Sequence, residues 1–106
     1  MSSEKLVKSL KSFAEEISAD YSLKSMYLFG SRAMKKRVRR DGDVNLPLVS
    51  DKFKGKRRLK RSPPLYLKRD LSYPVDFICL TPREFKKKKN EIGVIREAVR
   101  DGVKII

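Results

Sequence analysis

Three side chains with oxygen atoms stand where they could bind one divalent cation. Asp43 opens a strand-like segment and Asn45 follows two residues later, so the period of a strand places both side chains on one face. Asp76 lies inside a second apolar run, between Val75 and Phe77, where burying an unpaired carboxylate would be costly. Hard cations such as Mg²⁺ take oxygen ligands, usually one or two carboxylates with substrate phosphates and water. We therefore predict a metal site formed by Asp43, Asn45 and Asp76.

A glycine and a serine, Gly30 and Ser31, end the apolar run 26–29. We expect a strand that stops there and a brief helix capped by Ser31, an arrangement whose free N–H groups and helix dipole favour an anion such as a triphosphate. Basic residues are frequent between this turn and Asp43, and they serve either to handle phosphate or only to keep the chain in solution. They are Arg32, Lys35, Lys36, Arg37, Arg39 and Arg40.

The remaining pattern predicts the elements that position these residues. Residues 4–20 have the spacing of an amphipathic helix, and 25–29, 43–50 and 75–80 read as strands. Pro47 lacks an N–H, which favours an edge position, a bulge or a bent strand for 43–50. Residues 35–42 are expected to form a charged loop.

The second half of the chain contains a basic connection and a helix. We expect 52–69 to be mobile, with one or two helical turns broken at Ser62-Pro-Pro, and with Leu59, Leu65, Tyr66 and Leu67 as its apolar contacts. Thr81-Pro-Arg-Glu84 is a capping box that starts a helix. Its apolar stripe continues through Ile92, Ile95, Ala98 and Val99 to a left-handed cap at Gly102, and 103–106 can add a last strand. The fold class is therefore α/β or α+β: a small mixed sheet flanked by helices, in a single domain over 1–106.

Composition limits the function classes. The chain has 27 Lys and Arg against 13 Asp and Glu, a net charge of +14 that attracts phosphates, nucleic acid or acidic proteins. One cysteine and no histidine exclude a disulfide framework and a Cys-based zinc site. Because no apolar run is long enough to span a bilayer and the start is not a signal peptide, we expect a protein of the reducing cytoplasm without a membrane association.

Three stretches resemble the minimal nucleotidyltransferases of the polymerase-beta superfamily. They are Leu28-Phe-Gly-Ser-Arg-Ala, Asp43-Val-Asn-Leu-Pro-Leu-Val-Ser and Tyr73-Pro-Val-Asp-Phe-Ile-Cys-Leu-Thr-Pro-Arg-Glu-Phe, and the likeness runs from about Leu28 to the C-terminus. The resemblance implies that Gly30 and Ser31 hold the phosphates of a nucleoside triphosphate, with Arg32 beside them. It implies Asp43 as the first metal ligand and catalytic carboxylate, and Asp76 as the third carboxylate of the family.

The same resemblance implies a reaction and a partner. The family transfers a nucleotidyl group from ATP or another nucleoside triphosphate with two metal ions, usually Mg²⁺. Minimal members resemble antitoxins encoded beside a helical partner of the HEPN type, which in that family accepts the nucleotidyl group.

The sequence departs from the family pattern at two points. Asn45 replaces the second aspartate of Asp-x-Asp, and eleven residues rather than about ten separate Ser31 from Asp43. An amide brings no charge and cannot bridge two ions, so affinity for a second ion should fall. Reading Asp41 and Asp43 as the pair leaves only nine residues in the loop and puts Asn45 where the family strand turns apolar, so we prefer Asp43 with Asn45.

Alternatives of other classes remain open. The chain could be a catalytically impaired relative that acts by binding a partner, or a nucleic-acid-binding protein that uses Lys52–Arg69, although only Phe53 and Tyr66 are available there for base stacking. Asp76 could form a structural salt bridge with Arg32, and the run Lys86–Lys89 could be a solvated helix face.

Overall fold

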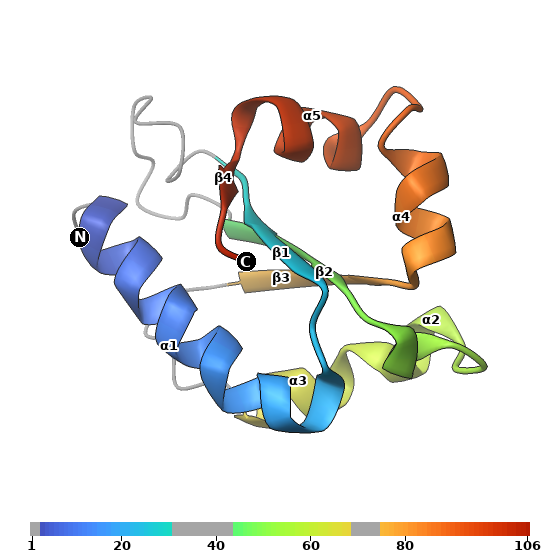
Figure 1. Cartoon of the computed structure of the whole chain (residues 1–106), viewed down its shortest axis with the longest axis horizontal. Helices are drawn as coiled ribbons and strands as arrows, with labels where there is room; N and C mark the ends of the chain where they lie inside the picture. The colour runs from blue at the N-terminus through green and yellow to red at the C-terminus, as the bar shows by residue number, and fades with distance from the viewer. Residues whose placement is uncertain (1–2, 31–43, 69–74) are drawn as a thin grey trace.

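The computed structural model describes residues 3–30, 44–68 and 75–106 (Figure 1). The predicted short helix after Ser31 and the predicted loop 35–42 lie outside these residues. In chain order the elements are α1 (Ser3–Tyr21), β1 (Ser25–Leu28), β2 (Val44–Val49), the 3₁₀ helix η1 (Asp51–Phe53), α2 (Arg58–Arg61), α3 (Pro63–Lys68), β3 (Val75–Leu80), α4 (Pro82–Lys88), α5 (Val94–Asp101) and β4 (Val103–Lys104).

Within the described ranges the strands form one four-stranded sheet in the order β3-β2-β1-β4. β2 and β3 run parallel, whereas β1 is antiparallel to both β2 and β4. Helices cover both faces: α1 and α3 lie below the sheet in Figure 1, and α4 and α5 lie above it. The prediction of a small mixed sheet flanked by helices is confirmed.

The main core lies between α1 and the lower face of the sheet. The apolar spacing that predicted the first helix places Leu10 and Ile17 there, both fully buried. Alternate strand residues point into the same core, among them Val44 and Leu46 of β2. The residues between them along β2 therefore face α4 and α5, because successive strand side chains point to opposite faces.

The edge position suggested for the strand around Pro47 is wrong, since β2 lies between β1 and β3. The proline instead interrupts the main-chain hydrogen bonds between β1 and β2. Ser25 pairs with Val49 and Met26 with Leu48, and the isolated bridge between Phe29 and Asn45 continues the same register after a gap. Phe29 and Asn45 exchange two main-chain hydrogen bonds, so the next hydrogen-bonded position in an antiparallel pair falls at Pro47, which has no N–H to donate.

The basic connection is packed on the core rather than a free linker. Phe53 and Leu65 are fully buried, and Tyr66 lies edge-on to Phe77 with 4.8 Å between ring centroids. The break at Ser62-Pro63 is confirmed, because α2 ends at Arg61 and α3 begins at Pro63. The predicted apolar contacts of two leucines are wrong: Leu59 is 85% exposed and Leu67 is 89% exposed. Residues two apart on a helix face different ways, so burial of Leu65 turns Leu67 outward.

The C-terminal half begins as predicted and then departs from the prediction. The capping box is present, with Thr81 and Glu84 bonded reciprocally at the start of α4. The single helix with a continuous apolar stripe is wrong, because the chain leaves the helix between α4 and α5, where Asn90 and Gly93 are poor helix formers. As a result, Ile92 and Val99 are exposed, while Ile95 and Ala98 are buried.

Gly102 does not form the predicted left-handed cap, since its φ is −82°. Its lack of a side chain allows a close approach between α5, β1 and the last strand. A Cβ atom at Gly102 would lie 2.5 Å from the Ala98 carbonyl oxygen and 2.6 Å from that of Leu28. The glycine therefore lets β4 pair with β1, which confirms the last strand.

Two further sequence expectations concern the cysteine and the membrane. Cys79 is a buried free thiol in β3, and burial raises its pKa to about 12, so the thiol stays neutral near pH 7. None of the helices in the described ranges is long and apolar enough to cross a membrane.

Candidate functional site

Two of the three predicted metal ligands are neighbours across the sheet. In the parallel pairing of β2 with β3, Asn45 is the register partner of Asp76. Cross-strand partners project from the same face of a sheet. Val44 and Leu46 point into the core beneath the sheet, so Asn45 and Asp76 project from the upper face, toward the side of α4 and α5.

The predicted phosphate turn begins beside this pair. Phe29 donates to the Asn45 carbonyl at 2.9 Å and accepts from the Asn45 amide at 2.6 Å, which ties the end of β1 to the start of β2. Gly30 follows directly with φ of 133°, a backbone conformation that glycine adopts far more easily than other residues. The structure thus brings Gly30, Asn45 and Asp76 to one end of the sheet.

The other predicted site residues, Ser31, Arg32 and Asp43, lie outside the described residues. Their roles stay predictions. In the sequence, Ser31 and Arg32 follow Gly30, and Asp43 precedes Val44, the first residue of β2.

The expected burial of Asp76 is wrong, because its side chain is exposed. Asp76 is the second residue of β3, an edge strand, and the helix that follows β3 begins only after Leu80. The cost of a buried carboxylate therefore gives no reason to expect a cation here. No ion pair joins Asp76 to a described basic residue, so this carboxylate is accessible from solvent.

Solved structures that resemble this chain include two crystal structures of candidate nucleotidyltransferases. The first, from Sulfolobus solfataricus, superposes with a TM-score of 0.65 at 21% identity, over 96% of this chain and 80% of that one. The second has a TM-score of 0.46 at 23% identity, over 77% of this chain and 85% of that one. No protein-family model and no curated protein matches the sequence.

The chain has the nucleotidyltransferase fold. The first similarity extends over nearly the whole chain, which establishes the architecture. The minimal subtype, the nucleotide and the acceptor stay predictions.

Within this nucleotidyltransferase fold, the described residues include two of the three predicted metal ligands, Asn45 and Asp76. No cluster of three acidic, histidine or cysteine side chains occurs in the ranges 3–30, 44–68 and 75–106. The Asp76 carboxylate and the Asn45 amide are nevertheless both oxygen donors of the kind that Mg²⁺ accepts, and they start from paired positions on one face. This donor set fits a hard cation if Asp43 and substrate phosphates complete it.

An arginine of the basic segment has a structural role that the sequence did not indicate. Arg61 is 7% exposed, and its guanidinium donates to the main-chain carbonyls of Lys56 and Cys79 and to the Glu84 carboxylate, the last at 2.6 Å. Burial raises the pKa of Glu84, but hydrogen bonds from Arg61 and the Thr81 amide outweigh it, and the net pKa lies below its usual value. Arg61 therefore joins the basic segment to β3 and α4.

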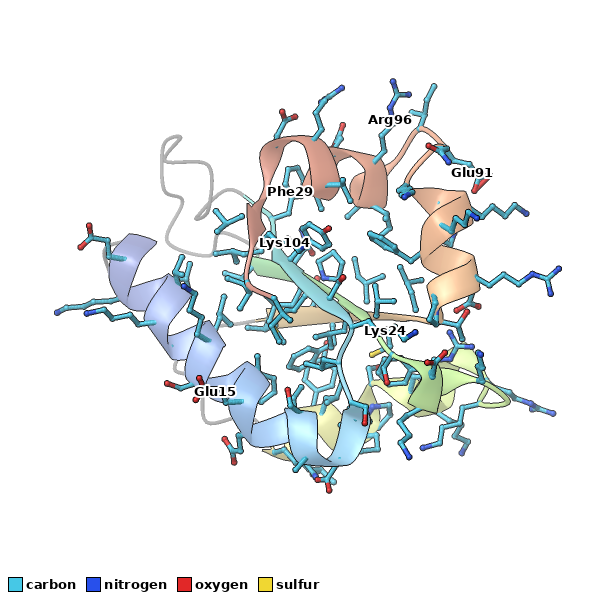
Figure 2. All side chains as sticks on the ribbon, viewed as in Figure 1. Glu15, Lys24, Phe29, Glu91, Arg96 and Lys104 are labelled. Atoms are coloured by element: carbon cyan, nitrogen blue, oxygen red, sulfur yellow. The ribbon has the colours of Figure 1, made fainter. Side chains whose placement is uncertain are left out.

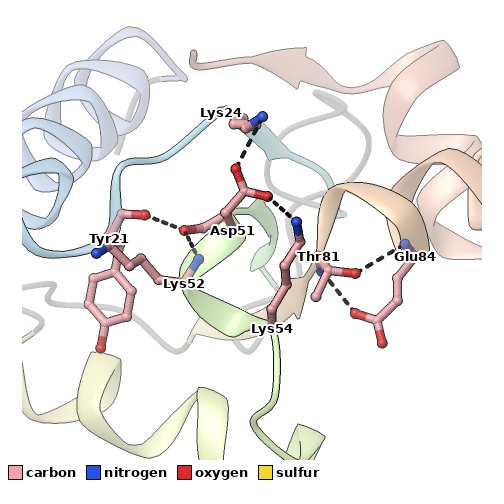
Figure 3. Close-up of polar contacts among 8 residues, drawn as sticks. Tyr21, Lys24, Asp51, Lys52, Lys54, Thr81 and Glu84 are labelled. Carbon is pink, nitrogen blue, oxygen red and sulfur yellow. Dashed lines mark hydrogen bonds and ion pairs between the residues drawn. The ribbon is translucent and has the colours of Figure 1, made fainter.

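Lys54 of this segment, together with Lys24 from the connection before β1, makes local ion pairs. Asp51 lies between Lys24, at 3.2 Å, and Lys54, at 3.1 Å, and hydrogen bonds from Lys54 and Lys24 lower its pKa (Figure 3). Beside it, the Ser50 hydroxyl donates to the Tyr21 carbonyl and accepts from the Lys52 amide. Two cations of the segment that could bind nucleic acid, Lys54 and Arg61, thus form ion pairs within the fold. In α4 the lysines are mainly exposed, as predicted for a solvated helix face.

Proposed function

We propose that this protein binds a magnesium-bound nucleoside triphosphate, ATP or another, and transfers a nucleotidyl group to a hydroxyl. The observation that supports the proposal is the cross-strand pairing of Asn45 with Asp76 beside Gly30, on a nucleotidyltransferase fold. An exposed carboxylate on the same sheet as a glycine turn, with Asn45 between them, supports binding of a cation and a triphosphate.

The proposed roles divide between two groups of residues. Asp43, Asn45 and Asp76 hold the cation, and the turn Gly30-Ser31 with Arg32 holds the triphosphate. When bound, Mg²⁺ neutralises phosphate charge and favours ionisation of the attacking hydroxyl. The neutral Asn45 leaves the site with less negative charge than two aspartates and a third carboxylate would provide, so binding of a second ion is weak.

The reaction is a substitution at the α-phosphorus. The acceptor oxygen forms a bond to that phosphorus, the bond from phosphorus to the bridging oxygen breaks, and pyrophosphate leaves with the electron pair. The hydroxyl proton passes to water or to a carboxylate of the site, such as the exposed Asp76.

The proposed acceptor is a hydroxyl on a partner protein, of the helical HEPN type that the resemblance implies. In this proposal a second chain completes the pocket around the nucleotide and the acceptor. Incubation with ATP labelled at the α-phosphate tests this step, because the label would appear on a protein that co-purifies with the chain. Label that stays in free nucleotide in the presence of that protein contradicts the transfer.

Calorimetric titration of the folded protein with Mg²⁺ and ATP tests the binding step. We expect Asp76→Asn to weaken Mg²⁺-dependent ATP binding by about tenfold or more, since one charged ligand is lost. Asp20→Asn is the matched control: Asp20 lies at the end of α1, on the opposite face, where it pairs with Lys68. Absence of heat at millimolar ATP, or equal effects of the two variants, would contradict the proposal.

A second function has support from Asn45 itself. A site without the second carboxylate is also what an impaired relative would have, acting by contact with a partner rather than by transfer. Both functions predict a folded protein with a partner surface, and only the first predicts nucleotide turnover.

A further inference from the structure

A groove runs along the outer edge of the sheet, away from the core between α1 and β2. It has a volume of about 560 Å³. β3 forms one side through Phe77–Leu80, and the end of the α4–α5 connection with the start of α5 forms the other through Ile92–Ile95. Lys88, Glu91 and Ser62 complete its rim.

Alternate residues of β3 direct their main-chain N–H and C=O groups toward this groove. In a parallel pair, every second residue bonds to the neighbouring strand and the others face away. Leu80 bonds to the β2 side, where its carbonyl accepts from Ser50, so Phe77 and Cys79 direct their N–H and C=O groups to the open edge.

Among the described residues, two side chains bond to the main chain at this edge. The Phe77 amide donates to the Tyr66 hydroxyl at 3.3 Å, and the Cys79 carbonyl accepts from Arg61 at 3.1 Å. Between them lie the Phe77 carbonyl and the Cys79 amide, to which no residue of the described ranges is bonded. If a further strand were added in parallel, one of its residues would donate its N–H to the Phe77 carbonyl, and the carbonyl of the same residue would accept from the Cys79 amide.

The walls of the groove indicate the side chains that would fill it. Ile92 is 93% exposed and Val94 is 41% exposed, and both line the groove, so an apolar side chain of a ligand would cover them. Two charged side chains line the groove, Lys88 and Glu91, and the cations that flank them in the chain are Lys86 and Lys87 of α4 and Arg96 of α5. Figure 2 shows Glu91 and Arg96 on the outer side of the connection between α4 and α5.

We propose that this groove binds an extended peptide segment of a partner protein, in which apolar residues are flanked by acidic ones. The segment adds to β3 in parallel through the Phe77 carbonyl and the Cys79 amide. Its apolar side chains cover Ile92 and Val94, and its carboxylates meet the lysines of α4. This inference is independent of nucleotidyl transfer and holds for either proposed function.

Fluorescence anisotropy with a labelled synthetic peptide tests the proposal. The probe has three central valines with two glutamates on each side. We expect saturable binding that Ile92→Glu weakens by about tenfold or more, because it puts a carboxylate where apolar and acidic groups of the peptide must lie. Leu67→Glu is the matched control, since Leu67 is similarly exposed, at 89%, but lies on α3 outside the groove.

Amide hydrogen exchange on the intact protein supplies a second readout. Bound peptide should slow exchange of the Cys79 amide and leave that of residues in α1 unchanged, because only the former gains a hydrogen bond. A peptide that does not bind at millimolar concentration would overturn the proposal, as would equal losses in the two glutamate variants. Tighter binding of a single-stranded oligonucleotide of equal charge, with the same sensitivity to Ile92→Glu, would assign the surface to nucleic acid and also overturn it.

Discussion

Asn45 and Asp76 are direct register partners on the parallel strands β2 and β3, one residue from the N-terminal end of each strand. Asn45 is also bonded through its main chain to Phe29, which precedes the glycine turn. An amide and a carboxylate thus project from paired positions on one face of the sheet, near the N-terminal ends of β2 and β3.

Asn45→Asp should make the stability of the protein depend on a bound cation. Two carboxylates in register repel each other, so without metal we expect a loss of about 1 kcal/mol in the free energy of unfolding. Mg²⁺ should reverse the loss and raise the melting midpoint more than it does in the parent protein. Thermal unfolding with Mg²⁺ and with a chelator measures both effects.

The same variant separates the two proposed functions. A large gain in nucleotidyl transfer with Asn45→Asp would show that the parent site is impaired, whereas unchanged transfer would favour a working site that uses the amide. A variant insensitive to Mg²⁺ in every assay would contradict a cation site beside Asp76.

Replacing Arg61 should destabilise the fold. Arg61→Ala removes bonds to two main-chain carbonyls and to Glu84, and we expect a loss of about 2–3 kcal/mol, since hydrogen bonds to charged groups are among the stronger ones. Arg61→Lys should restore only part of this, because an ammonium lacks the planar fork. Urea unfolding measures the loss, and Lys60→Ala, an exposed neighbour, should change stability by less than about 0.5 kcal/mol. Equal effects at the two positions would argue against a structural role for Arg61.

The low pKa of Glu84 predicts a dependence of stability on pH. Because the pKa is lower in the folded than in the unfolded protein, the contribution is complete above the unfolded value of about 4.5 and is lost as pH falls through the folded value. The difference in unfolding free energy between the parent and Glu84→Gln should therefore be constant near pH 6–7 and shrink in more acidic solution. A difference in unfolding free energy that increased as the pH fell would contradict the prediction that the Glu84 pKa is lowered in the folded protein.

Gly102→Ala should weaken the attachment of β4. The added methyl group would approach two main-chain oxygens, of Ala98 and Leu28, neither of which can rotate away. We expect a loss of about 1–3 kcal/mol, as for other overpacked positions. Thermal unfolding measures it. Gly55→Ala has open space around the new methyl group and only an unfavourable φ of 77° to overcome, so a smaller loss there is the control.

Features formed by residues close in the chain could be predicted from the sequence. The capping box of Thr81 and Glu84 and the break after Arg61 involve residues at most three or four positions apart, and side-chain and main-chain geometry at that range depends little on the rest of the protein. The period of two along a strand likewise explains why Asn45 lies on the face opposite Val44 and Leu46.

The burial of particular side chains could not be predicted in the same way. Asp76 and Ile92 lie in or near apolar runs, yet both are exposed, because an edge strand and a break between two helices leave them uncovered. Arg61 looked like one cation of a basic segment, and it is buried because three acceptors from separate elements surround it.

The sequence alone therefore determined the residue types of the candidate ligands, the individual strands, the first helix and the start of α4. Only the tertiary structure decided that Asn45 lies opposite Asp76, that the strand with Pro47 is central, and that Tyr66 and Arg61 bond to the main chain of β3 at the edge of the described sheet. The physical reason is that strand order and register depend on burial summed over the whole sheet and its covering helices, whereas propensity and capping depend on a few neighbouring residues.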